Sequence, residues 1–440
     1  MLAACGRDAQ TGPSHRSKSI SVESGDLQFG SAAAPLRRPL IVRVVDESGN
    51  PVSGASVHWS TDEDGALSPP DATTDDRGVA RASWTLGSRL GRQHAHALID
   101  GSNQADFAAD ATDADRPMPL PVVFPLETPD GSGQTVHPDH VIMPTSWKGS
   151  NEYLLITPYP NGNSGWENPA IFQPSGPLAW QTPAGATNPI VLPKFGYLSD
   201  PDAVAVPELN ELWVYYRQVQ LKNEIYLIRS NDGVTYTPPQ LVATADNHDI
   251  VSPSVVHRGP GDWLMWAVKS GSGCNASTTT IELRRSTNGL DWSRPEKVAL
   301  DQGSGISPWH IEVQWIPSRE EFWAVYNGKT AGSCATPALF LATSPDGTNW
   351  KTYPSPILMR GAIPELADIV YRSTFSYDDD GDMIDFWYSG ARFQFGQYDW
   401  RSAYQRRTRG EVFATAAKKS TAPLASMAPR RGAPPLLNAP

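Results

Sequence analysis

Residues 22–112 alternate apolar and polar positions at a period of two. The segment PLIVRVVDESGNPVSGASVHW (39–59) alternates, breaks at Gly49-Asn50-Pro51 and then alternates again. The pattern returns in residues 73–99 and 104–111. Such alternation indicates strands with one buried face, and the Gly-Asn-Pro break indicates a turn. The unit is therefore predicted to be a small β-sandwich.

Residues 135–417 contain a repeat of about 50–60 residues. The heptapeptides SNDGVTY (230–236), STNGLDW (286–292) and SPDGTNW (344–350) share the form Ser-x-Asp/Asn-Gly-x-x-aromatic. An apolar segment with a proline near its start lies between successive copies, and an aromatic segment follows it. Asp/Asn-Gly suits a tight turn, so these heptapeptides are interpreted as scaffold. Five units of about four short strands predict a five-bladed β-propeller.

Composition agrees with an all-β protein. The chain has 40 Pro, 36 Gly and 15 Trp, a balance typical of many short strands joined by turns. Its net charge of −11 argues against nucleic acid as a partner. No apolar run reaches the roughly 18 residues expected of a membrane-spanning helix.

The segments outside the two units differ in composition. Residues 1–21 are predicted to be a tether, 113–134 a Pro/Gly/Asp-rich linker and 418–440 a disordered Pro/Ala-rich tail. Leu2-Ala3-Ala4-Cys5 resembles the lipobox of bacterial lipoproteins, which implies lipidation of Cys5. An ordinary free cysteine is the alternative.

Candidate chemistry lies where a propeller gathers side chains. The innermost strand of each blade starts at one face of the central funnel, and the loop between its second and third strands returns to that face. The inner strands contribute Asp139, Asp200, Ser252, His310 and Arg372. The returning loops contribute Glu167, Arg217, Lys269 and Lys329.

Converging carboxylates suit glycoside cleavage, in which one acid protonates the leaving oxygen and a second activates water or attacks the sugar. We predict Asp139, Glu167 and Asp200 as catalytic residues. The predicted substrate-binding residues are His137, Trp166, Arg217, Lys269, Trp309, His310, Glu312 and Arg372. Trp147, Trp166 and Trp309 would offer apolar faces to sugar rings.

Each of these residues has a structural alternative. Asp139 and Asp200 could cap turns by accepting backbone hydrogen bonds. Glu167 could pair with Arg217 or Lys269. A metal bound by His137, His140 and His310 is conceivable, but no spacing motif for metal ligands is present, so no metal or cofactor is expected.

Cys274 and Cys334 occupy equivalent loops of neighbouring blades. A disulfide between them would fit an exported protein, and two free thiols are the alternative.

The chain resembles two known families, one in each of its two units. The segments PLIVRVVDESGNPVSGASVHW, TTDDRGVARASWTLG and ADFAADAT resemble the bacterial immunoglobulin-like (Ig-like) domains of the invasin and intimin kind. That resemblance implies an extracytoplasmic spacer or adhesive stalk.

The C-terminal 300 residues resemble the five-bladed glycoside hydrolases of the arabinanase/β-xylosidase and invertase/levansucrase group. Those enzymes open blades 1 and 2 with Asp and blade 3 with Glu. Asp139 in HPDHV and Asp200 in SDP match the first two positions, whereas Ser252 occupies the third. Glu167 in ENP is the expected substitute for the missing acid, because its loop should reach the same face.

We therefore expect a carbohydrate-active protein of the bacterial cell envelope, lipid-anchored or secreted. The first hypothesis is a glycoside hydrolase acting on a polysaccharide or oligosaccharide, with membrane contact only through a lipid on Cys5. The second is a non-catalytic, adhesin-like glycan-binding protein. The third is a glycoside phosphorylase in which Arg217, Lys269, Lys329 and Arg372 hold phosphate.

Overall fold

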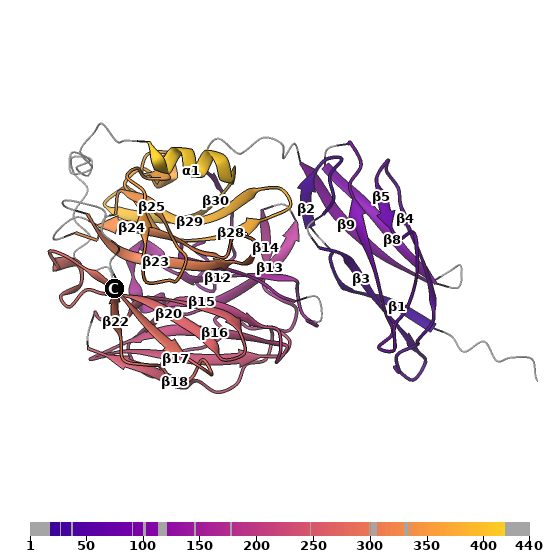
Figure 1. Ribbon diagram of the computed structural model, residues 1–440, viewed down its shortest axis with the longest axis horizontal. Helices are drawn as coiled ribbons and strands as arrows, with labels where there is room; N and C mark the ends of the chain where they lie inside the picture. The colour runs from indigo at the N-terminus through magenta and orange to yellow at the C-terminus, as the bar shows by residue number, and fades with distance from the viewer. Residues whose placement is uncertain are drawn as a thin grey trace, which may run out of the picture. The chain divides into compact units, whose positions relative to one another are not determined.

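The computed structural model describes residues 18–418, apart from 27, 37, 90, 100–102, 113–120, 145–146, 177, 247, 299, 301–305, 330–332 and 335. The chain divides into two compact units, Met1–Ala114 and Asp115–Pro440. Both units are built from strands (Figure 1). The predicted lipidation site Cys5 and the predicted tail beyond residue 418 lie outside the described residues. Within those residues, no helix has the length and apolar character needed to cross a membrane.

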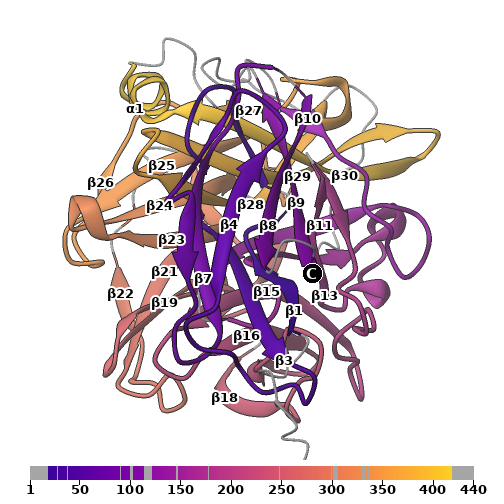
Figure 2. The ribbon, with the colours of Figure 1, turned by 90° about the vertical axis from the view of Figure 1, so that its right-hand side faces the viewer.

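The first unit is a two-sheet sandwich, as predicted (Figure 2). One sheet has the order β1 (Lys18–Ser24), β3 (Leu40–Asp46), β7 (Val79–Thr85), β5 (Ala66–Ser68). The other has the order β2 (Gln28–Ser31), β9 (Asn103–Thr112), β8 (Gly91–Ile99), β4 (Ser56–Thr61), β6 (Asp71–Thr73). The alternating apolar residues meet between the sheets, where Val42, Trp59, Trp84 and Phe107 are buried. Burial of such side chains is the main stabilising contribution to this unit.

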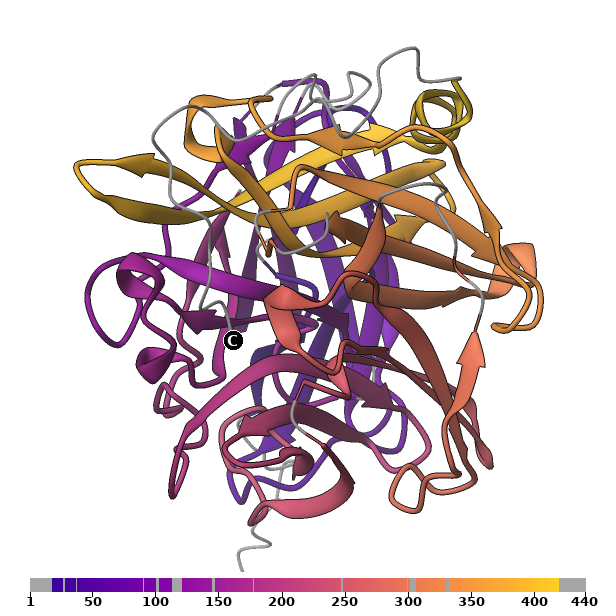
Figure 3. The same cartoon turned by 90° about the vertical axis from the view of Figure 1, so that its left-hand side faces the viewer.

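The second unit is the predicted five-bladed propeller, whose sheets follow one another around a central axis (Figure 3). Blade 1 contains β11 (Thr135–Ile142), β12 (Glu152–Pro158), β13 (Ala170–Gly176) and β14 (Ala179–Gln181). Blade 2 contains β15 (Tyr197–Val206), β16 (Glu211–Val219), β17 (Asn223–Ser230) and β18 (Gln240–Ala245). Blade 3 contains β19 (Val251–Gly259), β20 (Asp262–Lys269), β21 (Thr280–Ser286) and β22 (Glu296–Val298).

Blade 4 contains β23 (Ser307–Ile316), β24 (Glu321–Lys329), β25 (Ala338–Ser344) and β26 (Lys351–Thr352), and β27 (Leu358–Met359) also pairs with β25. Blade 5 contains β28 (Ile369–Asp378), β29 (Met383–Gln394), β30 (Gln397–Thr408) and β10 (Val122–Val123). Because β10 precedes the first blade in sequence, the ring is closed by a strand from the segment expected to be a linker.

Short helices complete the unit. They are η1 (Pro160–Gly162), η2 (Ser164–Trp166), η3 (Gly273–Asn275), η4 (Pro317–Arg319), η5 (Pro364–Leu366) and α1 (Arg409–Ala417). The Thr408 side chain caps α1 by accepting a hydrogen bond from the Glu411 N–H. Val412 and Ala416 of this helix are buried in the core of blades 4 and 5.

The repeated heptapeptides form matching turns that are hydrogen-bonded to the preceding blade. In the blade 3 turn, the Asn288 Oδ1 accepts hydrogen bonds from the N–H groups of Leu290 and Asp291. The Gly289 carbonyl accepts a hydrogen bond from the Tyr215 hydroxyl of blade 2. The blade 4 turn likewise accepts the Trp266 indole N–H at Gly347. The interpretation of these turns as scaffold is therefore confirmed.

The predicted disulfide is present. Cys274, in η3, is bonded to Cys334 in the loop between β24 and β25. It joins the second-to-third loops of blades 3 and 4.

Candidate metal and catalytic site in the central channel

Each innermost strand is irregular near its start. A β-bulge shifts the register of β11, β15, β19, β23 and β28 at this point. His137, Asp200 and Ser252 occupy equivalent places, with φ angles of 54°, 51° and 52°. The left-handed region is costly for residues other than glycine, and bulges commonly re-aim a side chain next to a site. The bulges thus direct one side chain from each of these three strands into the interior of the ring.

Three of the inner-strand residues meet in what we call the imidazole cluster, His137, Asp200 and His310. The Asp200 Oδ1 lies 3.3 Å from the His137 Nε2 and 3.4 Å from the His310 Nδ1. All three side chains are buried. The His137 Nε2, the Asp200 Oδ1 and both ring nitrogens of His310 make no hydrogen bond with any described residue. Buried polar atoms without partners are rare and indicate a missing ligand or a functional role.

Neighbouring charges fix the protonation states in this cluster. The Arg217 Nε lies 2.8 Å from the Asp200 Oδ2. Although burial favours the neutral acid, the positive charges of Arg217 and Arg372 help to hold the pKa of Asp200 well below its usual range. Burial lowers the pKa of His310 well below its usual value. An ionised carboxylate beside a neutral imidazole is the state in which both bind a metal ion.

Glu167 joins the cluster from the loop between β12 and β13. Its Oε2 lies 3.3 Å from the His137 Nδ1, which is also 3.1 Å from the Thr157 Oγ1. Glu167 is fully buried, and within the described part of the chain neither carboxylate oxygen makes a hydrogen bond. Burial raises the pKa of Glu167, and His137 only partly offsets this. A carboxyl group of this kind can exchange a proton near neutral pH.

A second group, the carboxylate cluster of Asp139, Asp202 and Glu312, lies two residues further along the same strands. One ligand atom from each acid lies within 4.8 Å of the other two. The Asp139 Oδ2 accepts the Ala203 N–H at 2.6 Å, and the Asp202 Oδ2 accepts the Val255 N–H at 2.9 Å. These bonds join blade 1 to 2 and blade 2 to 3. Burial raises the pKa of Asp139 to about 6 and those of Asp202 and Glu312 well above their usual values.

Arg372 lies between the two clusters. Its Nη1 is 3.6 Å from the Asp200 Oδ1, and its Nη2 is 3.8 Å from the Asp202 Oδ1 and 3.6 Å from the Glu312 Oε2. It therefore neutralises part of the charge of both clusters.

The structure divides the predicted catalytic residues. Glu167 and Asp200 lie on either side of His137, whereas Asp139 belongs to the carboxylate cluster. Of the predicted substrate-binding residues, His137, His310 and Arg217 lie with Asp200, and Glu312 lies with Asp139. The structural alternative for Asp139 and Asp200 is also observed, because the Asp139 Oδ2 accepts the Ala203 N–H and the Asp200 Oδ2 accepts the Ser252 N–H. The partner of Glu167 is His137 rather than Arg217 or Lys269.

The predicted tryptophans differ in exposure. Trp309 and Trp147 are 0% and 1% exposed, so neither presents the open face to a sugar that we expected. The Trp309 indole N–H donates to the Tyr371 hydroxyl within the core. Trp166, in η2 beside Glu167, is 47% exposed and stays a candidate sugar platform.

The basic residues of the phosphorylase hypothesis do not gather. The Lys269 Nζ lies 3.4 Å from both Asp249 and Glu282, and half of its side chain is exposed. The Lys329 Nζ donates to the Cys274 and Ala276 carbonyls next to the disulfide. Of these four basic residues, Arg217 and Arg372 reach the central acids.

The sequence did not predict His137, Asp200 and His310 as one set of candidate metal ligands, and it did not predict Asp202 as a site residue. The His140 ring stacks on the Trp387 ring, with 3.9 Å between the ring centroids. The residue that joins His137 and His310 is Asp200, and not the His140 of the three-histidine alternative. The missed signal is a repeated tripeptide, His137-Pro138-Asp139, Asp200-Pro201-Asp202 and Ser252-Pro253-Ser254. It aligns His137 with Asp200 and Asp139 with Asp202, and so predicts two successive layers.

Comparison with known proteins adds to this geometry. Residues 37–89 match the family model of the bacterial Ig-like domain (group 1). The chain is 28% identical over 308 residues to the A type blood N-acetyl-alpha-D-galactosamine deacetylase of Flavonifractor plautii, a match covering 58% of this chain and 40% of that protein. The chain thus spans less than half of the length of this relative.

Two solved structures are also similar to the chain. The N-acetylgalactosamine deacetylase of F. plautii, in complex with blood group B trisaccharide, matches with a TM-score of 0.60 and 23% identity, covering 68% of this chain and 97% of that chain. An α-L-arabinofuranosidase from Podospora anserina, in complex with cellotriose, matches with a TM-score of 0.45 and 12% identity over 66% and 95% of the two chains. The resemblance to bacterial Ig-like domains is therefore confirmed, and the propeller shares its fold with a carbohydrate-active enzyme.

Proposed function

We propose that the propeller is a metal-dependent hydrolase that removes the N-acetyl group from an amino sugar of an oligosaccharide or polysaccharide. The observation that carries the proposal is the imidazole cluster, with its unpaired buried donor atoms beside the buried carboxyl group of Glu167. The deacetylase activity of the F. plautii relative supports the choice of an acetamide as the reacting group.

The residues of the imidazole cluster fit a divalent transition metal. Two imidazoles and one carboxylate form a donor set that suits zinc, iron, cobalt, nickel or manganese. The contacts of the His137 Nδ1 with Thr157 and Glu167 leave its Nε2 for the metal. A divalent ion held there would supply Lewis acidity toward the acetamide carbonyl and toward water.

The remaining steps belong to side chains of the protein. Glu167, as the carboxylate, accepts a proton from the water whose oxygen adds to the acetamide carbonyl carbon. It then donates that proton to the nitrogen as the carbon–nitrogen bond breaks, which yields acetate and a free amine. Its raised pKa suits both transfers. Arg217 keeps Asp200 ionised, and the exposed indole of Trp166 provides a platform for the sugar ring.

The test is acetate release by the purified full chain from a panel of N-acetylated saccharides. We expect the wild type to release acetate from at least one of them, and Glu167→Gln to lower the rate by about 10²–10⁴-fold because it cannot accept the proton. Glu296→Gln, at an exposed position of β22, is the matched control and should retain full activity. Binding of a saccharide without any turnover by the wild type would contradict the proposal.

Glycoside hydrolysis is the second candidate. The pKa values of Glu167 and Asp200 are displaced in opposite directions although both residues contact His137, and such pairs often divide the roles of acid and base. New reducing ends in the same panel, without acetate, would favour this candidate over deacetylation.

We also propose that the protein is held at the bacterial envelope by a lipid on Cys5. The Ig-like domain and the disulfide are typical of exported proteins. Metabolic labelling with a fatty-acid analogue should mark the wild type and not Cys5→Ser. Equal labelling of the two proteins would contradict the anchor.

A further inference from the structure

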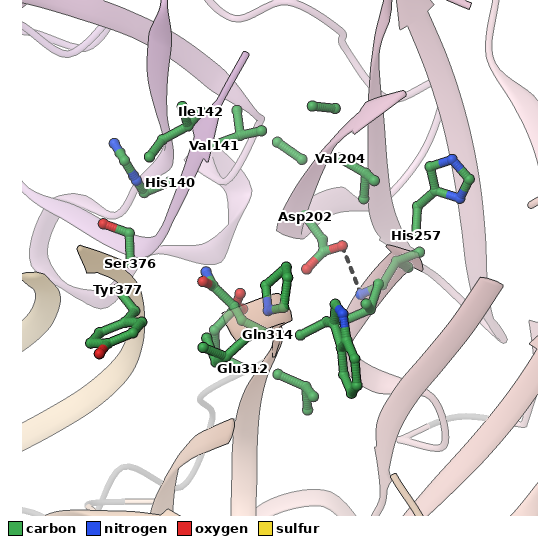
Figure 4. Close-up of a pocket in the computed structure, with 18 of the residues that line it drawn as sticks. His140, Val141, Ile142, Asp202, Val204, His257, Glu312, Gln314, Ser376 and Tyr377 are labelled. Carbon is green, nitrogen blue, oxygen red and sulfur yellow. Dashed lines mark hydrogen bonds between the residues drawn. The ribbon is translucent and has the colours of Figure 1, made fainter. Parts of the chain in front are cut away.

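A cavity of about 620 Å³ lies along the channel beyond the carboxylate cluster. Its lining comes from the later parts of inner strands β11, β15, β19, β23 and β28, together with η4. Asp202 and Glu312 belong to this lining, and His137, Asp200 and His310 do not. Figure 4 shows Asp202 hydrogen-bonded through one oxygen, with its other oxygen turned toward the interior of the cavity. The cavity therefore reaches the carboxylate cluster but not the imidazole cluster.

The charges of the carboxylate cluster are not balanced by the described side chains around it. Asp139, Asp202 and Glu312 contribute three negative charges when ionised, and Arg372 contributes one positive charge, which leaves a net charge of −2. Arg372 also contacts Asp200. Buried charges without compensation are strongly unfavourable, so the cluster needs a cation or bound protons.

Several polar atoms around the cavity make no hydrogen bond with the residues that the structure describes. The Glu312 Oε2 has no hydrogen-bond partner among them, and its nearest cation, the Arg372 Nη2, is 3.6 Å away. Ser376 and His140 also line the cavity, and the buried Ser376 Oγ and His140 Nδ1 make no hydrogen bond with the described residues. The Ser376 and His140 atoms do not belong to the three acids, and they indicate a polar ligand or the water molecules around it.

The ligand atoms of the carboxylate cluster determine which class of cation it would bind. All three side chains of the cluster offer oxygen, with one ligand atom each within 4.8 Å of the others. Calcium takes six to eight oxygen ligands at about 2.3–2.6 Å, and the adjacent cavity has room for the water molecules that would complete such a shell. Transition metals instead favour the nitrogen ligands of the imidazole cluster.

We propose that Asp139, Asp202 and Glu312 form a second site in the channel, which binds a hard divalent cation of the calcium class. The three ligands come from β11, β15 and β23, so the cation links blades 1, 2 and 4. Because unfolding separates these ligands, occupancy stabilises the ring.

Calcium binding by the chelator-treated full chain tests this site. Isothermal titration calorimetry with calcium chloride should show one ion per chain, and saturation at about 100 times Kd should raise Tm by about 5 °C. Glu312→Gln should lower the calcium affinity at least about tenfold. Its amide is isosteric and removes repulsion within the cluster, so this variant should fold.

The controls separate this site from general electrostatic attraction and from the proposed deacetylase activity. Asp379→Asn removes one charge from the exposed rim of the same cavity and should leave calcium affinity unchanged. His310→Ala should keep calcium binding even though it disrupts the imidazole cluster. Three results would overturn the proposal. They are the absence of calcium binding, an equal loss of calcium affinity in Asp379→Asn, and binding of the ammonium group of galactosamine hydrochloride in place of calcium.

Discussion

At the residue scale, the site depends on backbone geometry that the resemblance to glycoside hydrolases does not reveal. The resemblance to glycoside hydrolases predicted that Asp139 and Asp200 open equivalent strands. The structure instead aligns Asp200 with His137, which lies two residues before Asp139. In both strands the residue before the proline of the bulge has a positive φ angle. Two residues of a strand span about 6.6 Å, which is enough to move Asp139 out of reach of Glu167 and into the other cluster. Asp139 and Asp200 thus lie on inner strands, as predicted, but they belong to two groups rather than one.

Ser252 tests the left-handed bulge at a position whose own side chain is not a proposed ligand. It has φ 52°, and its buried hydroxyl makes no hydrogen bond with the described residues. Ser252→Val should lower the free energy of unfolding by about 1–3 kcal/mol, because a β-branched residue is strained in this region. Ser252→Gly should stay within about 1 kcal/mol of the wild type. Urea denaturation measures both, and equal stability of the Gly and Val variants would contradict the account.

Lys329 predicts a pH dependence of stability. Burial lowers its pKa to about 8, whereas a lysine in an unfolded chain titrates near about 10.4. Between these values the unfolded chain binds more protons, so the free energy of unfolding rises with pH across the window. In Lys329→Met this contribution is lost, and stability relative to the wild type should fall as pH rises from about 8 to about 10. A pH-independent difference between the two proteins in urea denaturation would be the opposing result.

At the scale of elements, the repeat predicted the blades well because the turn and the aromatic strand recur at a regular spacing. The alternation of residues 39–59 predicted the sandwich strands for the same reason. The strand β10 was not predicted, because two residues of an apolar, Pro-rich segment carry no periodicity. Helix α1 was missed as well, since its nine residues bury only Val412 and Ala416 and show no clear apolar stripe. Tertiary packing, rather than local pattern, determines both elements.

Substitution of Gly289 tests the contact between the blade 3 turn and blade 2. It has φ 70°, and a Cβ there would lie 2.7 Å from the Trp213 ring and 2.8 Å from the Tyr215 hydroxyl. Gly289→Ala should lower the free energy of unfolding by about 2–4 kcal/mol through strain and displaced aromatic packing. Gly261, at φ 84°, has nothing within 4 Å of such a Cβ, so Gly261→Ala should cost about 1 kcal/mol. Similar losses of unfolding free energy in the two variants would argue against a stabilising contact between the turn and blade 2.

At the scale of the whole molecule, ring closure brings distant residues together. The inner strands of blades 1, 2 and 4 supply His137, Asp200 and His310, so the imidazole cluster forms only when the blades assemble. The repeat predicted this convergence, because every inner strand of a propeller borders the same channel. It did not predict two clusters, since the depth of a side chain in the channel depends on the register within each blade.

The disulfide adds a covalent link between blades 3 and 4. It closes a loop with a sequence separation of 60. The double variant Cys274→Ala/Cys334→Ala should lower the free energy of unfolding by about 2–4 kcal/mol, because the unfolded chain gains conformational freedom. Denaturation in the absence of reductant measures this difference, and a variant as stable as the wild type would show that the bond does not brace the ring.

The central claim is that the imidazole cluster holds a catalytic metal, and metal-dependent acetate release measures this most directly. Chelator-treated wild-type protein should release little acetate from an N-acetylated saccharide that the untreated protein hydrolyses. Zinc, manganese, cobalt or nickel should restore the rate, and calcium should not. His310→Ala should stay inactive with every metal, because one ligand is lost. Full activity after complete removal of metal, or an active His310→Ala variant, would contradict the account.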